Sequence, residues 1–147
     1  MVATMPASEY PFYYVYEVIF HDLDAMGHVN NAAYFVYMET IRIKYVVDTL
    51  RLNSADLRTS IVVAEASCTY HSPAFQNEHL TLGVGVSRLG HKSFDLLYRI
   101  DAPDRLVLTG KTVQVAYDYE NQQAIPVPDD FRRRVQDYQR GWQPPAE

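Results

Sequence analysis

A long stretch free of helix breakers constrains the fold more than any other feature of this chain. From Asn30 or Asn31 to Leu50 there is no glycine or proline, and Asn30 is a good N-cap. We therefore expect one helix about 30 Å long. Residues 32–38 are largely apolar at every position, and a helix that is apolar on all sides is buried on all sides. The rest of the chain must enclose this first half.

The surface that encloses the helix comes from five predicted strands. Before the helix, residues 13–20 are dense in aromatic and β-branched side chains, which is a strand signature. After it, apolar side chains alternate with mostly polar ones in four segments: residues 62–70, 80–87, 94–100 and 106–119. The short connections between them require antiparallel pairing. This order predicts an α+β fold in which a curved, antiparallel, five-stranded sheet wraps around one long central helix.

A second helix is expected near the C-terminus, at about residues 128–141. Phe131, Val135, Tyr138 and Trp142 recur there at helical spacing behind Pro128. A length of 147 residues suits a single domain over residues 1–147, with its core at about residues 13–120.

Composition excludes several classes of protein. With 48% hydrophobic and 21% charged residues the chain is globular, and its net charge of −5 argues against a broad nucleic-acid surface. No stretch approaches the ~20 apolar residues that cross a bilayer, and the N-terminus lacks the pattern of a signal peptide. Cys68 is the only cysteine, and its neighbours indicate an inert core position. We expect a cytoplasmic protein with no nucleic-acid or membrane partner.

Residues 20–34 carry the pattern with the clearest chemistry. Asp24 stands in a polar loop just before the N-terminus of the buried helix. Free backbone N–H groups and the positive end of the helix dipole meet there, where they can polarise a carbonyl and hold an oxyanion. A carboxylate on the other side of that carbonyl can act as a nucleophile or a general base. The loop therefore has the parts of an acyl-transfer site.

The same run resembles the signature Asp-x-Asp-x-x-Gly-His-Val-Asn-Asn-x-x-Tyr of hotdog-fold acyl-CoA thioesterases of the 4-hydroxybenzoyl-CoA thioesterase type. Here the signature is Asp22, Asp24, Gly27, His28, Val29, Asn30, Asn31 and Tyr34. The strand order also matches, so the resemblance covers roughly residues 13–119. It implies a hotdog fold and hydrolysis of an acyl-CoA thioester without a cofactor. It also implies a homodimer, assembled into a homotetramer, with each active site at the subunit interface.

The resemblance assigns roles to individual residues. Asp24 is the expected catalytic carboxylate, and the backbone amide of Asn31 is expected to polarise the thioester carbonyl. His28 is a further catalytic candidate that could instead only pack at the helix start. Asn30 and Tyr34 are candidates for substrate binding. Residues 70–73 correspond to a part of the family that lines the tunnel for pantetheine.

A second cluster lies in the predicted hairpin tip after residue 87. Arg88, Lys92 and Ser93 suit the phosphates of coenzyme A, and Lys92 matches a phosphate-contacting lysine in the related enzymes. A charged hairpin tip is also typical of an ordinary solvated turn. Residues 132–134, all arginine, are either a solvated helix face or an added phosphate contact.

Several alternatives stay open from the sequence. Asp24 can be an Asx-turn residue, and Asp22 can be structural or can raise the pKa of Asp24. His21, Asp22, Asp24 and His28 form a possible metal cluster, but their spacing fits no standard ligand pattern. Glu39 is a reserve catalytic candidate and otherwise a surface ion-pair partner of Arg42. A non-catalytic acyl-CoA-binding or sensor module on the same fold is the alternative function.

Overall fold

Residues 5–52 and 59–146 are described by the computed structural model. In chain order the elements are the 3₁₀ helix η1 (Ala7–Glu9), β1 (Phe12–Glu17), the 3₁₀ helix η2 (Phe20–Asp22), α1 (Ala33–Arg42), the π-helix η3 (Ile43–Thr49), β2 (Thr59–Tyr70), β3 (His79–Leu89), β4 (Ser93–Ala102), β5 (Arg105–Asp118), β6 (Gln123–Ala124) and α2 (Asp129–Tyr138). The strands pair antiparallel in the order β1-β3-β4-β5-β2, and the unexpected short β6 pairs with β5.

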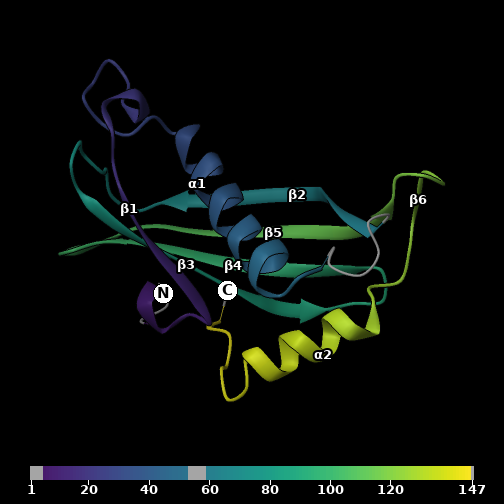
Figure 1. The fold of residues 1–147 in the computed structure, drawn as a ribbon. Coiled ribbons are helices and arrows are strands. Elements are labelled where there is room, and N and C mark those ends of the chain that lie inside the picture. Colours follow the sequence, from purple (N-terminus) through teal and green to yellow (C-terminus); the bar gives the residue numbers. More distant parts are fainter. Residues whose placement is uncertain (1–4, 53–58, 147) are drawn as a thin grey trace.

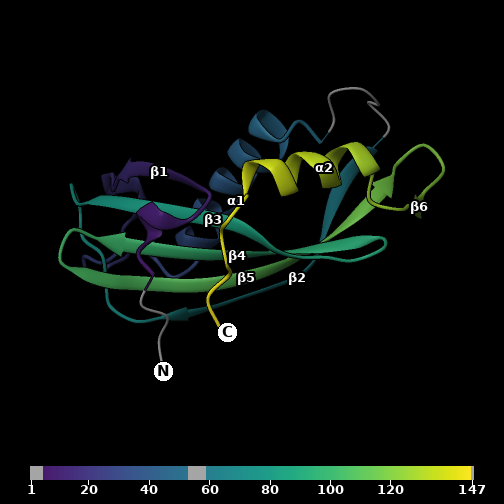
Figure 2. The same ribbon diagram turned by 90° about the horizontal axis from the view of Figure 1, so that it is seen from below.

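The sheet curls around α1, which crosses one face of it, while α2 covers the end of the same face (Figures 1 and 2). The core lies between α1 and the central strands. Met38, Ile41 and Tyr45 on the helical segment are buried, and so are Leu82 on β3 and Leu96 on β4. The predicted α+β class, the five main strands and the central helix are confirmed.

The central helix differs from the prediction in its boundaries and hydrogen bonding. It begins at Ala33, and after Arg42 it continues as the π-helix η3 to Thr49. The backbone N–H of Leu50 donates to the carbonyl of Tyr45, five residues earlier. The prediction that Asn30 is the N-cap is wrong: Ala32 holds that position without a side-chain cap. Asn30 instead forms an Asx turn before the helix, in which its Oδ1 accepts the N–H of Ala32 at 2.9 Å.

The prediction that the first half of the helix is enclosed on all sides is wrong for this chain alone. Tyr34, Tyr37 and Met38 are buried, but Phe35 is 40% and Val36 is 58% exposed. A single sheet is a single layer, so it reaches only the side of the helix that faces it. An apolar side of α1 is left open.

Arg42 is not on the polar side of the helix, where its charge would place it. It is 7% exposed, and its Nη1 donates to the Tyr98 hydroxyl at 3.3 Å. The hydrogen bonds continue from Tyr98 to Thr112 (2.8 Å) and from Thr112 to Gln114 (2.6 Å). The expected surface pair with Glu39 exists at 3.8 Å, but only Glu39 is at the surface.

Strand β2 also departs from the expected alternation. A register shift between Val63 and Glu65 inserts a bulge, so the apolar alternation does not run unbroken along the strand. β2 pairs only with β5 and is an edge of the sheet. Ala64 and Ala66, expected to be covered, are exposed. The alternation predicted for residues 62–70 therefore does not produce a buried apolar face in the middle of β2.

The predicted C-terminal helix is present but shorter, and its apolar side is narrower. Phe131 and Val135 are buried, and the Phe131 ring lies 5.1 Å from that of Phe94. Tyr138 is 49% exposed, and Trp142 lies beyond the helix, 5.6 Å from the Tyr10 ring. No helix in the described part of the chain is long and apolar enough to cross a membrane.

Gln139, directly after α2, makes hydrogen bonds to the backbone of β3 at a position that β1 does not reach. β1 begins opposite Val84, so the backbone of Val86 lies beyond its reach. The Gln139 side-chain amide accepts the Val86 N–H at 2.8 Å and donates to the Val86 carbonyl at 2.9 Å. Its oxygen also accepts the Tyr45 hydroxyl at 2.6 Å. One side chain thus joins α2, β3 and the central helix.

We predict that Gln139→Ala lowers the free energy of unfolding by about 2 kcal/mol, because it leaves buried backbone and hydroxyl groups without partners. Urea unfolding measures the change. Gln136, exposed on the same helix, provides the matched control: Gln136→Ala should change stability by less than about 0.5 kcal/mol. Equal effects of the two substitutions would contradict the role of Gln139.

Candidate active site

The loop before α1 folds as a small hairpin closed by its own backbone. The Asp24 N–H donates to the His28 carbonyl at 2.8 Å, and the Asn30 N–H donates to the Asp22 carbonyl at 2.8 Å. Gly27 sits at the turn with φ +82°, a left-handed conformation that favours glycine. The hairpin fixes the position of Asp24 relative to the helix that follows.

Asp24 is exposed, and its carboxylate is oriented by the loop. Oδ1 accepts the N–H groups of Met26 at 2.9 Å and His28 at 3.3 Å. This is the Asx-turn geometry that the sequence left open. Both bonds use the same oxygen, and no group in the described residues donates to Oδ2. The turn therefore orients the carboxylate and leaves one oxygen for chemistry.

The start of α1 lies beside this loop and is tied to the end of β2. The Tyr70 hydroxyl donates to the Asn31 carbonyl at 2.9 Å, and the Tyr70 ring lies 5.5 Å from that of Tyr34. Asn31 lies immediately before Ala32, the N-cap of α1, and in the described residues its backbone N–H has no hydrogen-bond acceptor. The pKa of the buried Tyr34 hydroxyl is raised by burial.

These elements line an open pocket of about 370 Å³. Its lining comes from the loop, the helix start and the end of β2 with the residues after it: Asp24, His28, Val29, Asn31, Tyr34, Tyr70, His71, Ser72 and Pro73. Asp24, His28, Asn31 and Tyr34 of the expected site therefore open on one space. Asn30 is next to it but does not line it. His71 is held by a 2.8 Å hydrogen bond between its Nε2 and the Thr109 hydroxyl.

Asp22 turns away from Asp24 and is structural. Its Oδ2 accepts the Tyr16 hydroxyl at 2.6 Å and the Ile19 N–H at 3.2 Å. Burial, reinforced by the Asp22 carboxylate, raises the pKa of Tyr16 to about 12. In the described residues, no group of three histidine, cysteine, aspartate or glutamate side chains lies close enough to hold a metal ion.

Comparison with known proteins decides the family. Residues 18–135 match the model of the thioesterase-like superfamily. The chain belongs to the thioesterase-like superfamily. Thioester hydrolysis is the general chemistry that this membership supports.

Individual relatives agree with that membership. An uncharacterized protein, YsmA of Bacillus subtilis (strain 168), is 30% identical over 129 residues, which are 87% of each chain. A thioesterase from Thermus thermophilus, solved in complex with coenzyme A and Zn, is 28% identical with a TM-score of 0.76, covering 88% of this chain and 94% of that one. A predicted thioesterase from Bacillus stearothermophilus shares the fold at a TM-score of 0.80 and 22% identity, over 90% of this chain and 98% of that one.

The second expected cluster of this thioesterase-like chain lies at the other end of the sheet. Ser93 pairs with Val115 of β5, whereas Tyr70, at the pocket, pairs with Leu108. Seven residues of a strand span about 23 Å. Within one chain, Arg88, Lys92 and Ser93 therefore do not meet the Asp24 pocket.

The hairpin tip is partly occupied with its own contacts. Arg88 Nη2 donates to the Ser93 hydroxyl at 2.9 Å and to Asp95 at 2.8 Å, while Lys92 is exposed. The arginines of α2 are also engaged: Arg132 donates to the carbonyls of Gly90 and His91.

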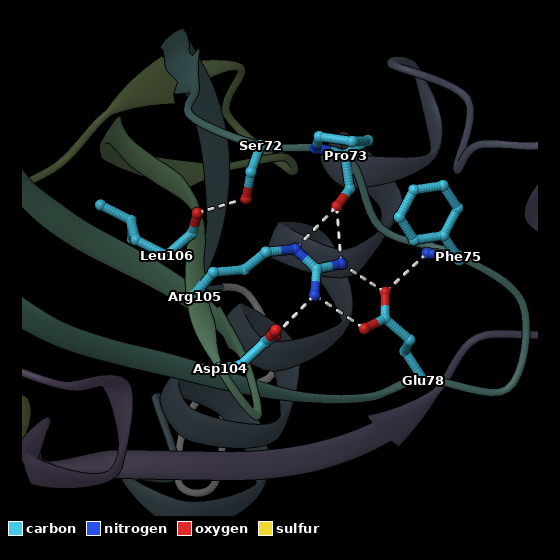
Figure 3. Close-up of polar contacts among 7 residues, drawn as sticks. All are labelled: Ser72, Pro73, Phe75, Glu78, Asp104, Arg105 and Leu106. Atoms are coloured by element: carbon cyan, nitrogen blue, oxygen red, sulfur yellow. Dashed lines mark hydrogen bonds and ion pairs between the residues drawn. The ribbon is translucent and has the colours of Figure 1, made fainter.

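The wall of the pocket rests on residues that the sequence analysis missed. Arg105, the first residue of β5, donates to the Pro73 carbonyl and to the Glu78 carboxylate, and Glu78 accepts the Phe75 N–H at 2.8 Å (Figure 3). No motif marks an arginine after a turn as a partner of a loop 27–32 residues earlier. Only the fold brings them together.

Glu78 makes the stability of this region depend on pH. The hydrogen bonds from Arg105 lower the pKa of the Glu78 carboxyl below its ordinary value of 4.5. A lowered folded pKa stabilises the protein above the unfolded pKa, and this contribution is lost as the pH falls through the folded value.

We therefore predict that the thermal midpoint falls as the pH is lowered below about 4.5, the ordinary value, and that Glu78→Gln reduces the slope of this fall. Thermal unfolding between pH 7 and pH 3 measures both proteins. Glu39→Gln is the control, because Glu39 is 66% exposed and 3.8 Å from its partner. Identical slopes for wild type and Glu78→Gln would contradict the prediction.

Proposed function

We propose that this protein hydrolyses the thioester bond of an acyl-CoA, with Asp24 as the catalytic carboxylate and the Asn31 N–H polarising the carbonyl. The observation that carries the proposal is the shared pocket of about 370 Å³ onto which Asp24 and the start of α1 both open. Membership of the thioesterase-like superfamily supports the reaction class. The relative from Thermus thermophilus, solved with coenzyme A, supports the leaving group.

The geometry suggests how the bond is broken. A thioester carbonyl at the helix start places its oxygen near the unpaired amide and the positive end of the dipole, where the oxyanion is stabilised. Asp24 Oδ2 either attacks the carbonyl carbon, giving an acyl anhydride that water hydrolyses, or removes a proton from an attacking water. In both routes the C–S bond breaks and the thiolate of coenzyme A leaves. Single-turnover hydrolysis in ¹⁸O-labelled water tests the anhydride route. Water that attacks the Asp24 carboxyl carbon of the anhydride puts label into Asp24, whereas general-base catalysis puts label only into the product acid.

We predict that Asp24→Asn lowers kcat by about 10²- to 10⁴-fold on the best substrate of an acyl-CoA panel while the fold is kept. Thiol release measures turnover and circular dichroism measures folding. Asp22→Asn is the matched control: it weakens the charged acceptor of the Tyr16 hydroxyl to a neutral amide oxygen, so it should cost some stability but little kcat. Near-normal kcat in Asp24→Asn would exclude the mechanism, and tight acyl-CoA binding without turnover in the wild type would indicate a binding module.

The proposal extends to a homodimer joined through β2. This strand is long, lies at the edge of the sheet and leaves one row of backbone groups unpaired, which is a template for pairing. Val63 and Tyr70 on β2 and Phe35 on α1 are apolar and each at least 40% exposed. Two copies joined edge to edge would form an isologous interface, and a tetramer would follow by pairing of dimers.

Such a dimer would bring the two halves of the site together. In an antiparallel twofold pairing, the beginning of one β2 lies beside the end of the other. The pocket is at the end of β2, and the tip that carries Lys92 is at the end of the sheet where β2 begins. The partner subunit's Lys92 would therefore approach the pocket of this chain and could bind the phosphates of its coenzyme A.

We predict that Lys92→Ala raises KM and leaves kcat nearly unchanged, because the phosphates are far from the scissile bond. Arg140→Ala is the control, since Arg140 is an exposed cation on the segment after α2. Mixed dimers of Asp24→Asn and Lys92→Ala subunits then test the shared site. One site of each mixed dimer would combine Asp24 with the partner subunit's Lys92, so the mixture should recover a fraction of wild-type activity with the wild-type KM.

Two outcomes would contradict the shared site. A mixture whose residual activity keeps the high KM of Lys92→Ala would mean that Lys92 serves its own chain or none. A fully active monomer, seen by light scattering under assay conditions, would exclude the dimer altogether.

A further inference from the structure

We infer that Arg105 is a positioning residue for the thioester pocket: it holds the segment after β2 as a rigid wall against which the Asp24 loop and the start of α1 are placed. This inference rests on the proposed function and adds to it a residue outside the pocket. Figure 3 shows the guanidinium between Pro73 and Glu78, which belong to the β2–β3 connection, and Asp104, which belongs to the β4–β5 turn.

The first link runs from Arg105 to the pocket lining. Nη2 and Nε donate to the Pro73 carbonyl at 2.8 and 3.2 Å. Pro73 lines the pocket, and so does Ser72, whose hydroxyl donates to the Leu106 carbonyl at 2.5 Å. The beginning of β5 thus holds two consecutive residues of the wall.

The second link runs through Glu78. Its carboxylate accepts hydrogen bonds from Nη2 of Arg105 at 2.5 Å and from Nη1 at 2.9 Å. This bidentate ion pair fixes the orientation of both groups. Arg105 and Glu78 are only 26% and 22% exposed, so solvent screens the pair little. Glu78 then accepts the Phe75 N–H at 2.8 Å and so closes the turn 75–78.

The third link runs from this turn to the catalytic loop. The Phe75 ring lies 5.6 Å from the Arg105 guanidinium and meets the His28 ring edge-on at 5.3 Å. The adjacent Ala74 carbonyl accepts the N–H of Val29 at 2.9 Å. His28 and Val29 both line the pocket, and the His28 N–H is one of the donors that orient Asp24. A shift of the wall is therefore passed to the catalytic carboxylate.

Loss of the Arg105 contacts would release residues 73–78 and allow His28 and Asp24 to move relative to the helix start. A misplacement of about 1 Å far from the chemistry can cost about 100-fold in rate. Binding of coenzyme A would be affected less, because its phosphates are proposed to contact another part of the assembly. The expected signature is a lower kcat with a nearly constant KM.

The experiment compares Arg105→Met, Arg105→Lys and Arg99→Met in the full-length protein. Arg99 is the matched control, because it pairs with Asp101 at 2.9 Å on β4 and is even less exposed than Arg105, at 11% against 26%. Asp101 accepts the Ala7 N–H, and in the described residues it makes no hydrogen bond to a residue that lines the pocket. We expect Arg105→Met to lower kcat by about 10- to 100-fold with KM within about 3-fold, and Arg99→Met to keep kcat within about 2-fold. Arg105→Lys keeps the positive charge but lacks the planar guanidinium that bonds Pro73 and Glu78 together. Its kcat should therefore lie between those of Arg105→Met and the wild type.

Amide hydrogen exchange gives a second measurement that does not depend on catalysis. The N–H groups of Val29 and Phe75 are bonded within the supported wall, so they should exchange at least about tenfold faster in Arg105→Met and not in Arg99→Met. If the wild type hydrolyses no acyl-CoA, the proposed function fails, and exchange alone still decides whether Arg105 holds the wall.

Three results would overturn the inference. The first is unchanged exchange at Val29 and Phe75. The second is faster exchange with unchanged kcat, which would mean that the wall does not position the reacting groups. The third is an equal loss of kcat in Arg105→Met and Arg99→Met, which would reflect general destabilisation.

Discussion

The packing of α1 on the concave face of the curled sheet carries most of the core, and a single layer of strands can cover only one side of a helix. Tyr34, Met38 and Ile41 use that side, while Phe35 and Val36 remain outside it. The sheet itself ends at β2, whose outer edge has no strand beside it in the described part of the chain. On the flank of β2 away from β5, the described residues therefore leave backbone groups unpaired by another strand and apolar side chains of α1 exposed.

The same packing explains where the candidate site lies. Because α1 crosses the sheet, its N-terminus lies near the end of β2, and the connection between β2 and β3 contacts the loop that precedes it. The loop that enters the helix closes as a hairpin around Gly27 and leans on that turn through Val29. Helix start, carboxylate and wall are thus placed by contacts between segments far apart in sequence, and Arg105 adds the contact that stiffens the wall.

Features encoded by local patterns could be predicted from the sequence, and features that depend on distant neighbours could not. The main strands follow from alternation and turns, and the placement of Asp24 beside a helix start follows from the chain between residues 20 and 34. The burial of Arg42 could not be foreseen, because its acceptor Tyr98 is 56 residues away and a charged residue near a helix surface is ordinarily solvated. The bulge in β2 lies between Val63 and Glu65, where the run of apolar residues 61–64 does not say which of them faces the core. Arg105 and Glu78 appear in sequence as ordinary charges beside turns.

The exposure of Asp24 connects the open flank to the proposed chemistry. A carboxylate and a helix N-terminus that face bulk water interact weakly with a carbonyl, because water screens fixed charges and dipoles far more than a protein interior does. In this chain alone Asp24 is exposed, and the pocket is walled mainly by the loop, α1 and the end of β2. A second copy along β2 would cover the apolar residues left open on that flank and exclude water from the pocket. In the proposed dimer, the contact that pairs the open edge of β2 would also keep water from the pocket, so assembly and activity would share one physical cause.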